Sequence, residues 1–319
     1  MGTINLTQDS EGYWIISTPA DLQEFSRIVN SGMYRTANAK LTADLDMSEV
    51  TDFCPIGVID NGDSYSKGAA LSNLGFAGTF EGQKHVIRNL TAPYNPSYGA
   101  SGVFGLVTGT VRDLGIDNYV FDFGEKDPYS GRFAALAGQL VEGRIENCWV
   151  TGSTVIHPNE IVAALVAGNY GGTVSRCWEF SNDIQAYSRA GRLVGDPADD
   201  NGVRRGTQEY CVSEGAVAGT YTSTLIDCYS DMPTDAFLSG EVTFRLNGDQ
   251  KEIVWYQTIG EDNLPTMDST RGKVFAQGEF NCDGSAKEGE ITYTNTPNEV
   301  VIPDHVYEYG ICVDRKSVV

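Results

Sequence analysis

The sequence predicts an all-β fold: a right-handed parallel β-helix (solenoid) with an N-terminal helical cap and a C-terminal capping segment. Three observations lead to this prediction. Glycine is abundant between short apolar runs, with 36 glycines in 319 residues and no collagen-like period. A degenerate repeat of roughly 20 to 35 residues runs through the middle of the chain. One amphipathic helix precedes the repeat.

The repeat has two halves. One half is a Gly-ended apolar run, found at residues 102–105, 134–138, 164–168 and 192–195. The other half reads apolar, polar, polar, then Leu or Cys, at residues 87–90, 111–114, 145–148 and 174–177, with degenerate copies ending at Cys211 and Cys228. A single coil cannot bury its inward face alone, so coils must stack, with equivalent residues in rows. Crossover connections between parallel strands favour the right-handed wind.

The predicted N-terminal helix begins at Thr18, a candidate N-cap that precedes Pro19. Leu22, Phe25 and Val29 recur at helical spacing, and residues 30–32 end the helix. These signals divide the chain into four predicted parts: a cap at 1–35, the parallel β-helix at 36–235, a C-terminal cap at 236–279, and a linker with a fragment of a small following module at 280–319.

The seven cysteines are interpreted as core residues. None lies in a CxxC pair, and the odd number excludes a complete disulfide set. Four of them, Cys148, Cys177, Cys211 and Cys228, fall at equivalent positions of the repeat, which favours buried small apolar residues over bridges.

Charge restricts the possible partners. The formal net charge of −21 repels phosphate backbones and anionic membrane surfaces, so no nucleic acid is expected as a partner. No window reaches the roughly 20 apolar residues of a membrane span, so no membrane insertion is expected. We expect a monomer.

At several segments the chain resembles bacterial cell-surface proteins with GLUG-type repeats. The similar segments are residues 14–22, 41–46, 55–57, 76–82, the repeats from 102 to 228, and 239–265. The resemblance covers most of residues 12 to 275. It implies a right-handed β-helix in a large secreted or wall-anchored protein, often an adhesin or a multidomain hydrolase, and therefore an extracellular or cell-surface location. It carries no shared catalytic motif. Residues 305–312 are similar to the start of a short His/Cys module whose second cysteine pair is missing here.

The candidate ligand-binding residues are aromatic and are expected in loops or turns. Exposed aromatic rings stack on sugars and anchor protein partners. The alternative is that these rings cover the ends of the inward rows. The residues singled out are Tyr119, Phe121, Tyr129, Tyr170 and Tyr187.

Signals for catalysis or metal binding are weaker. Asp113, Asp117, Asp122 and Glu125 lie close in sequence, as a glycosidase carboxylate pair would, and Lys126, Arg132 and Arg144 are the basic residues that a uronate-cleaving lyase would need. The acidic loop at 196–202 lacks the spacing of an EF-hand. Of the three histidines, His85 is read as structural and His157 as a surface-loop residue, with His305 far from both.

No catalytic residue, metal site or cofactor is predicted. The expected function is a non-enzymatic surface module that binds a glycan or a host surface protein. The alternatives are a carbohydrate-active β-helix enzyme, either a polysaccharide lyase or a glycoside hydrolase, and a structural spacer.

Overall fold

The structure is a computed structural model. It describes residues 3–58, 75–93, 95, 98–122, 131–157, 161–186, 189–196, 205–219, 223–278, 291–297, 307–308 and 311–312. The chain divides into two compact units, Met1–Asp231 and Met232–Val319. Over the described residues, sheets of parallel strands and the helix α1 (Pro19–Asn30) form the first unit.

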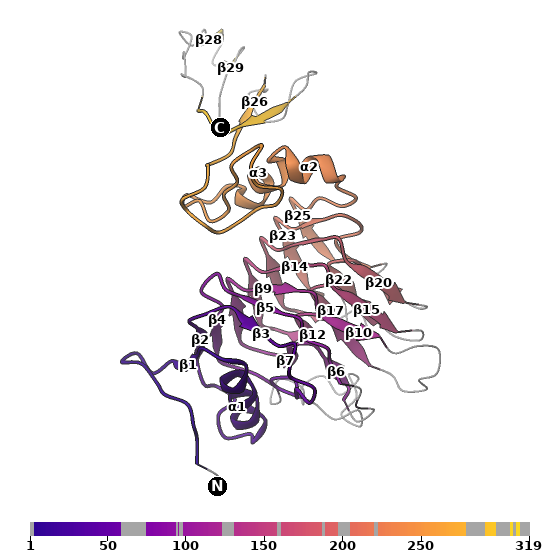
Figure 1. Cartoon of the computed structure of the whole chain (residues 1–319). Coiled ribbons are helices and arrows are strands. Elements are labelled where there is room, and N and C mark those ends of the chain that lie inside the picture. The colour runs from indigo at the N-terminus through magenta and orange to yellow at the C-terminus, as the bar shows by residue number, and fades with distance from the viewer. Residues whose placement is uncertain are drawn as a thin grey trace. The chain divides into compact units, whose positions relative to one another are not determined.

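Two sheets of parallel strands, here called sheet A and sheet B, dominate the first unit (Figure 1). Among the described residues, sheet A consists, in order, of β1 (Trp14–Ile16), β2 (Ala39–Leu41), β4 (Thr79–Glu81), β8 (Thr110–Arg112), β13 (Arg144–Glu146), β18 (Thr173–Ser175), β23 (Thr207–Glu209) and β25 (Thr224–Ile226). Sheet B consists of β3 (Leu45–Asp46), β5 (Val86–Arg88), β9 (Gly115–Asp117), β14 (Trp149–Thr151), β19 (Trp178–Phe180) and β24 (Val212–Ser213).

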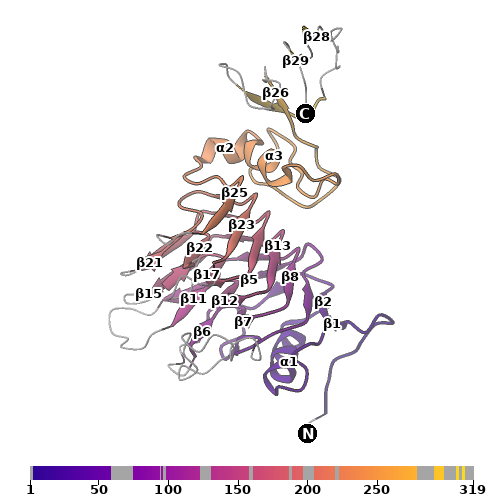
Figure 2. The same cartoon turned by 180° about the vertical axis from the view of Figure 1, so that it is seen from behind.

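Three smaller parallel sheets complete the first unit, and Figure 2 shows several of their strands from behind. Sheet C contains β7 (Phe104–Val107), β12 (Ala137–Val141), β17 (Val166–Tyr170) and β22 (Val194–Asp196). Sheet D contains β6 (Ala100–Ser101), β11 (Arg132–Ala134), β16 (Ile161–Ala163) and β21 (Arg189–Ala190). Sheet E contains β10 (Val120–Asp122), β15 (Thr154–His157) and β20 (Asp183–Ala186). The prediction of a mostly β chain with parallel strands and few helices is confirmed.

Strands of a sheet pair in register, so equivalent residues of successive repeats form rows. The central residues of the sheet A strands make one such row, which is Phe80, Val111, Ile145, Val174, Gln208 and Leu225. Its first four members are fully buried in the main hydrophobic core. In β8 and β13 the buried central residue lies between flanking residues that are half-buried or exposed, as a strand with one buried face requires, whereas β25 at the end of the sheet is exposed throughout.

Polar residues in the left-handed region turn the chain after the strands of sheet A. Asp113 and Asn147, with φ of 55° and 52°, occupy the third position of the four-residue pattern, ahead of the buried Leu114 and Cys148. Asn and Asp tolerate this region better than most residues. The copy at residues 87–90 was wrongly grouped with the others, because its strand β5 belongs to sheet B.

The cysteine row is confirmed as core at three of its four positions. Cys148, Cys177 and Cys211 are fully buried, Cys228 is half-buried, and all four are free thiols. Burial raises the pKa of the Cys177 and Cys211 thiols well above the usual value, because the charged thiolate loses its hydration.

Helix α1 begins and ends as predicted. The Thr18 side chain accepts a hydrogen bond from the Asp21 backbone N–H at 3.2 Å, and the Asp21 carboxylate accepts one from the Thr18 N–H at 2.9 Å. On the buried face, Phe25 lies 6.0 Å from Phe76 and 6.1 Å from Phe80, measured between ring centroids. The helix therefore covers core residues of the first repeats. No described helix has the length and apolar character needed to span a membrane.

Removing the N-cap should measurably weaken the first unit. Thr18→Ala leaves the Asp21 N–H without its partner, so we expect the free energy of unfolding to fall by about 1 kcal/mol. Chemical denaturation followed by circular dichroism measures the change. Thr7→Ala, at an exposed position outside the helix, is the control, and an equal loss in both variants would contradict the capping role.

The second unit contains α2 (Thr234–Leu238), α3 (Glu241–Asn247), the antiparallel pair β26 (Phe275–Gln277) and β27 (Thr292–Thr294), and the pair β28 (Tyr307–Glu308) and β29 (Ile311–Cys312). The buried Asn247 and Gln257 tie its backbone together. Asn247 Oδ1 accepts from the Trp255 N–H at 3.0 Å, and Gln257 Nε2 donates to the Phe237 carbonyl at 2.7 Å. Its role as a cap stays a prediction.

Candidate functional site

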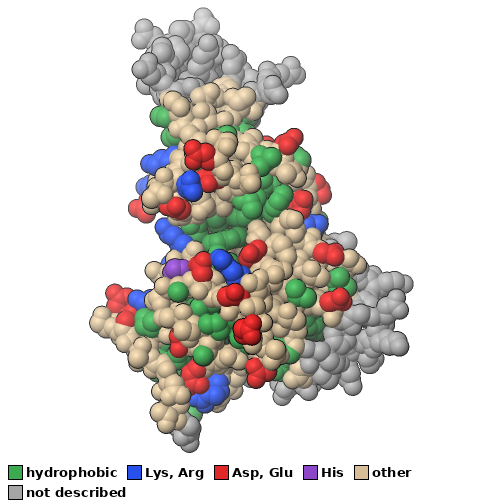
Figure 3. All heavy atoms as spheres, viewed as in Figure 1, with side chains coloured by type: hydrophobic (Ala, Val, Ile, Leu, Met, Phe, Trp, Pro, Cys, Tyr) green, Lys and Arg blue, Asp and Glu red, His purple; other side chains and the backbone are tan. Residues whose placement is uncertain are grey.

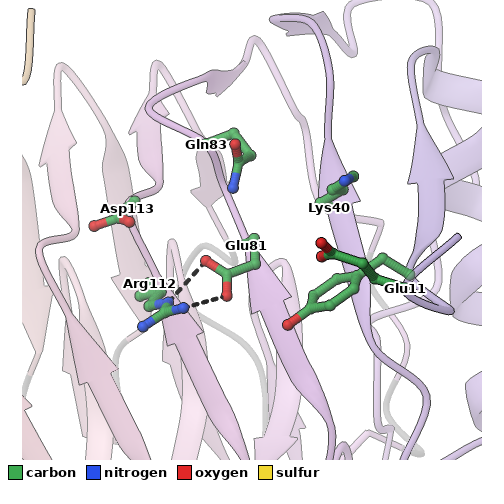
Figure 4. A pocket seen from close by; sticks show the side chains of 7 residues that line it. Glu11, Lys40, Glu81, Gln83, Arg112 and Asp113 are labelled. Carbon is green, nitrogen blue, oxygen red and sulfur yellow. Dashed lines mark hydrogen bonds and ion pairs between the residues drawn. The ribbon is translucent and has the colours of Figure 1, made fainter. Parts of the chain in front are cut away.

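A polar groove lies over the outward face of sheet A near the N-terminal end of the first unit (Figure 4). Its volume is about 300 Å³, at the lower end of the roughly 300–1,000 Å³ of small-molecule sites. The groove is lined by Glu11, Tyr13, Lys40, Glu81, Gln83, Arg112 and Asp113.

A tight turn brings Glu11 and Tyr13 to the groove. Asp9 organises this turn, because one of its carboxylate oxygens accepts hydrogen bonds from the backbone N–H groups of Glu11 and Tyr13, both at 2.9 Å. Gly12, with φ of 85°, supplies the left-handed residue that the turn needs. In Figure 4 the Glu11 carboxylate points into the groove.

Both basic side chains of the groove are paired with carboxylates. Arg112 holds Glu81 through two hydrogen bonds of 2.7 and 2.6 Å, and Glu81 is only 5% exposed. The Glu81 hydrogen bonds raise the pKa of the Arg112 guanidinium. Lys40 lies 2.5 Å from Asp9, which raises the pKa of the Lys40 ammonium, and it also sits 5.7 Å from the Tyr13 ring centroid.

Asp113 and Gln83 occupy turns at the ends of β8 and β4. The Asp113 carboxylate accepts a hydrogen bond from Asn147 Nδ2 at 2.9 Å. Partial burial raises the pKa of Asp113, and the Asn147 hydrogen bond and the Arg112 charge only partly offset this. In Figure 4 the Asp113 carboxylate points away from Glu81, whereas the Gln83 amide is directed toward Glu81.

The strand register of sheet A places three residues of the groove in a longer row. In register order this row is Lys40, Glu81, Arg112, Glu146, Ser175 and Glu209. Neighbouring strands lie about 4.8 Å apart. Ser175 is fully buried and Glu81 only 5% exposed, so Lys40, Arg112, Glu146 and Glu209 are the side chains of this row that a linear molecule lying across the strands could meet.

The predicted aromatic binding residues are not exposed where the structure describes them. Tyr119 is fully buried at the corner between β9 and β10, and Phe121 stacks on Phe133 with ring centroids 4.5 Å apart. Tyr170 is 3% exposed in β17 and accepts a hydrogen bond from Arg132. Tyr119 and Phe121 belong to the main core, and Tyr170 to a small buried cluster with Ala100, Leu106 and Val141.

Placing these three rings in exposed loops or turns was therefore wrong, because their side chains fill space inside or between the sheets. Tyr129 and Tyr187 lie outside the described residues, so their role stays a prediction.

The carboxylates that lie close in sequence are spread over three sheets. Asp113 follows β8 of sheet A, Asp117 ends β9 of sheet B and Asp122 ends β10 of sheet E, while Glu125 and Lys126 lie outside the described residues. The basic residues are already engaged, Arg132 with Tyr170 and Arg144 with Glu146 and Glu209 at 3.2 and 3.3 Å.

The structure does not bring the described histidines together with acidic or cysteine side chains as a metal site would require. His85 Nδ1 lies 3.0 Å from Asp44, in line with a structural role. His157 is fully buried in β15 and stacks on Phe133 at 4.9 Å, so its assignment to a surface loop was wrong. His305 and most of the acidic loop at 196–202 lie outside the described residues. The part of the chain that the structure describes holds no group of three or more His, Cys, Asp or Glu side chains suited to a metal ion.

Sequence reasoning missed the groove. Glu81 and Arg112 each follow the buried central residue of a strand, which marks both as outward-facing. Their bidentate contact depends on the register of β4 with β8, whose residues are 31 positions apart in the chain. The irregular repeat lengths conceal that register.

Comparisons with known proteins give a structural likeness only. No protein-family model matches the chain, and no curated protein matches it. A solved structure from Bacteroides ovatus, provisionally named an immunoglobulin A1 protease, is similar with a TM-score of 0.47 and 16% sequence identity. The likeness covers 82% of this chain and 94% of that chain.

Proposed function

We propose that this chain is a non-catalytic glycan-binding module, built on a right-handed parallel β-helix and displayed outside the cell. The observation that carries the proposal is the sheet A groove, where amide, guanidinium, ammonium, carboxylate and phenol groups line one hollow. Sugars present rings of hydroxyl groups, and several planar polar groups beside an aromatic ring suit them. The in-register strands and the row of buried central residues support the β-helix.

The contacts inside the groove favour binding over catalysis. Hydrolysis of a glycosidic bond uses two carboxyl groups that flank it, one as an acid and one as a base or nucleophile. Here Arg112 holds Glu81, and Asp113 is turned toward Asn147. The Glu11 carboxylate points into the groove, and the two other lining carboxyl groups, which could pair with it, are held by Arg112 and Asn147 (Figure 4). An adhesin-like or glycan-binding surface module therefore fits the geometry better than a lyase or a hydrolase.

The test is a broad glycan array, followed by affinity measurements on Gln83→Gly. Gln83 is exposed and has φ of 52°, so glycine removes the amide without straining the turn. Loss of one or two hydrogen bonds should weaken binding of the selected glycan by about 3- to 10-fold.

Ser181→Gly is the matched control. Ser181 is also an exposed polar residue with positive φ, at 57°, and it lies beside sheet B rather than in the groove. We expect this variant to bind as the parent does. An array without binding, or equal weakening by both substitutions, would contradict the proposed site.

A further inference from the structure

We propose that the groove selects by charge, accepting neutral and amino sugars and rejecting uronates and sialic acids. This inference rests on the proposed function and names the class of sugar that the same groove takes. It depends on which charged side chains of the groove are already paired within the protein and which remain available to a ligand.

The basic groups that an acidic sugar would need are each already paired with a carboxylate of the protein. A carboxylate-bearing sugar is usually held by an Arg or Lys that can give it two or more hydrogen bonds. Arg112 spends its Nε and one terminal nitrogen on Glu81, at 2.7 and 2.6 Å. Breaking this pair would leave Glu81, only 5% exposed, without its counter-ion. Lys40 is held by Asp9 at 2.5 Å.

The Glu11 carboxylate is the acceptor of the groove that is left facing the ligand, because it points into the hollow (Figure 4). Asp113 lines the hollow as well, with its carboxylate bonded to Asn147. Counting the lining residues and Asp9, two basic side chains, Lys40 and Arg112, stand against four acidic ones, Asp9, Glu11, Glu81 and Asp113. The excess of carboxylates repels an anionic sugar, attracts an ammonium group, and accepts hydrogen bonds from hydroxyl groups.

The surroundings reinforce this preference. The whole chain carries a formal net charge of −21, and Figure 3 shows acidic side chains spread over one face of the molecule. Long-range attraction of an acidic polysaccharide is therefore absent as well. Salt should weaken the discrimination, because the Debye length shortens to roughly 3 Å at 1 M ionic strength.

The experiment compares three β-1,4-linked tetrasaccharides with the same backbone. Cellotetraose is neutral, the fully deacetylated chitosan tetramer is cationic, and C6-oxidised cellotetraose is anionic. In isothermal titration calorimetry at low salt, the amino tetramer should bind with at least the affinity of cellotetraose. The affinity of the uronate tetramer should be lower than that of cellotetraose by about tenfold or more. At 1 M salt the three affinities should approach one another.

A charge reversal locates the effect. Glu11→Lys should raise the affinity for the uronate tetramer several-fold and lower that for the amino tetramer. Glu49→Lys changes the net charge equally at an exposed position outside the groove, and it should leave both affinities nearly unchanged. Glu11 lies on an exposed turn, so the variant is expected to fold.

The outcomes separate the two proposals. Equal binding of all three tetramers, or equal effects of the two lysine substitutions, overturns the charge selection and leaves the glycan-binding function standing. Tighter binding of the uronate tetramer overturns the charge selection outright. If none of the three binds, the charge selection fails for this backbone, and the glycan array decides the proposed function separately.

Discussion

Arg192→Ala is expected to lower the free energy of unfolding of the first unit by about 3 kcal/mol, the lower end of the cost of breaking a buried ion pair. Its partner Glu179 is fully buried and lies in register between Val150 and Ser213 in sheet B. Arg192 Nε donates to Glu179 at 3.2 Å, and another guanidinium nitrogen donates to Glu214 at 2.9 Å. The Arg192 side chain is 32% exposed, so solvent screens the ion pair and the loss of stability should stay at this lower end.

The loss arises because Glu179 remains buried without its counter-ion. It would still accept hydrogen bonds from Asn182 Nδ2 and Ser213 Oγ, both at 2.8 Å, but these neutral donors cannot replace a charge. Denaturant unfolding followed by circular dichroism measures the change.

Arg144→Ala provides the contrast for this measurement. Its partners Glu146 and Glu209 are 25% and 24% exposed, so the loss there should stay below about 1 kcal/mol. Replacing the first pair together, as Arg192→Met with Glu179→Leu, should recover part of the stability because no buried charge is left. The recovery stays incomplete because Asn182 Nδ2 and Ser213 Oγ lose Glu179 as an acceptor. Equal, small losses in Arg192→Ala and Arg144→Ala would contradict this account.

Gln208→Leu is expected to act in the opposite direction and raise the free energy of unfolding by about 1–3 kcal/mol. Gln208 is fully buried in the sheet A row between Val174 and Leu225, and among the described residues neither atom of its amide has a hydrogen-bond partner. Leucine has a similar volume and removes two buried polar atoms that lost their hydration on folding.

Gln257→Leu is the matched comparison. Gln257 is equally buried, but its amide donates to the carbonyls of Phe237 and Asp262 at 2.7 and 3.1 Å and accepts from Thr243 Oγ1 at 2.6 Å. Leucine at position 257 would leave the two carbonyl groups and the Thr243 hydroxyl without these hydrogen bonds, so it should lower the free energy of unfolding of the second unit. If Gln208→Leu also destabilises its unit, then the Gln208 amide is satisfied by groups such as ordered water.

Local features of the fold could be predicted from the sequence because each depends on neighbouring residues. The N-cap at Thr18 with its partner Asp21 lies within three positions, and the helix follows. The pattern that ends in Cys148 and Cys177 marks a buried row, because strand alternation makes its first residue inward. These local signals were sufficient to predict parallel strands whose inward residues form buried rows.

The groove could not be predicted in the same way, because it depends on which strands are neighbours. Lys40 meets Asp9 across 31 positions, and Glu81 meets Arg112 across the same distance. The error at Phe121 has a related cause. In sequence it resembles an exposed loop aromatic, but stacking on Phe133 from a different sheet encloses it.

The row of free cysteines gives the first unit an internal set of reporters. Each of Cys148, Cys177, Cys211 and Cys228 belongs to a different repeat, and their exposure ranges from fully buried to half-buried at the last. In an array of stacked repeats, local opening can begin at an end and spread inward. The rate at which an alkylating reagent labels each thiol therefore measures the opening of one repeat at a time, without an introduced probe.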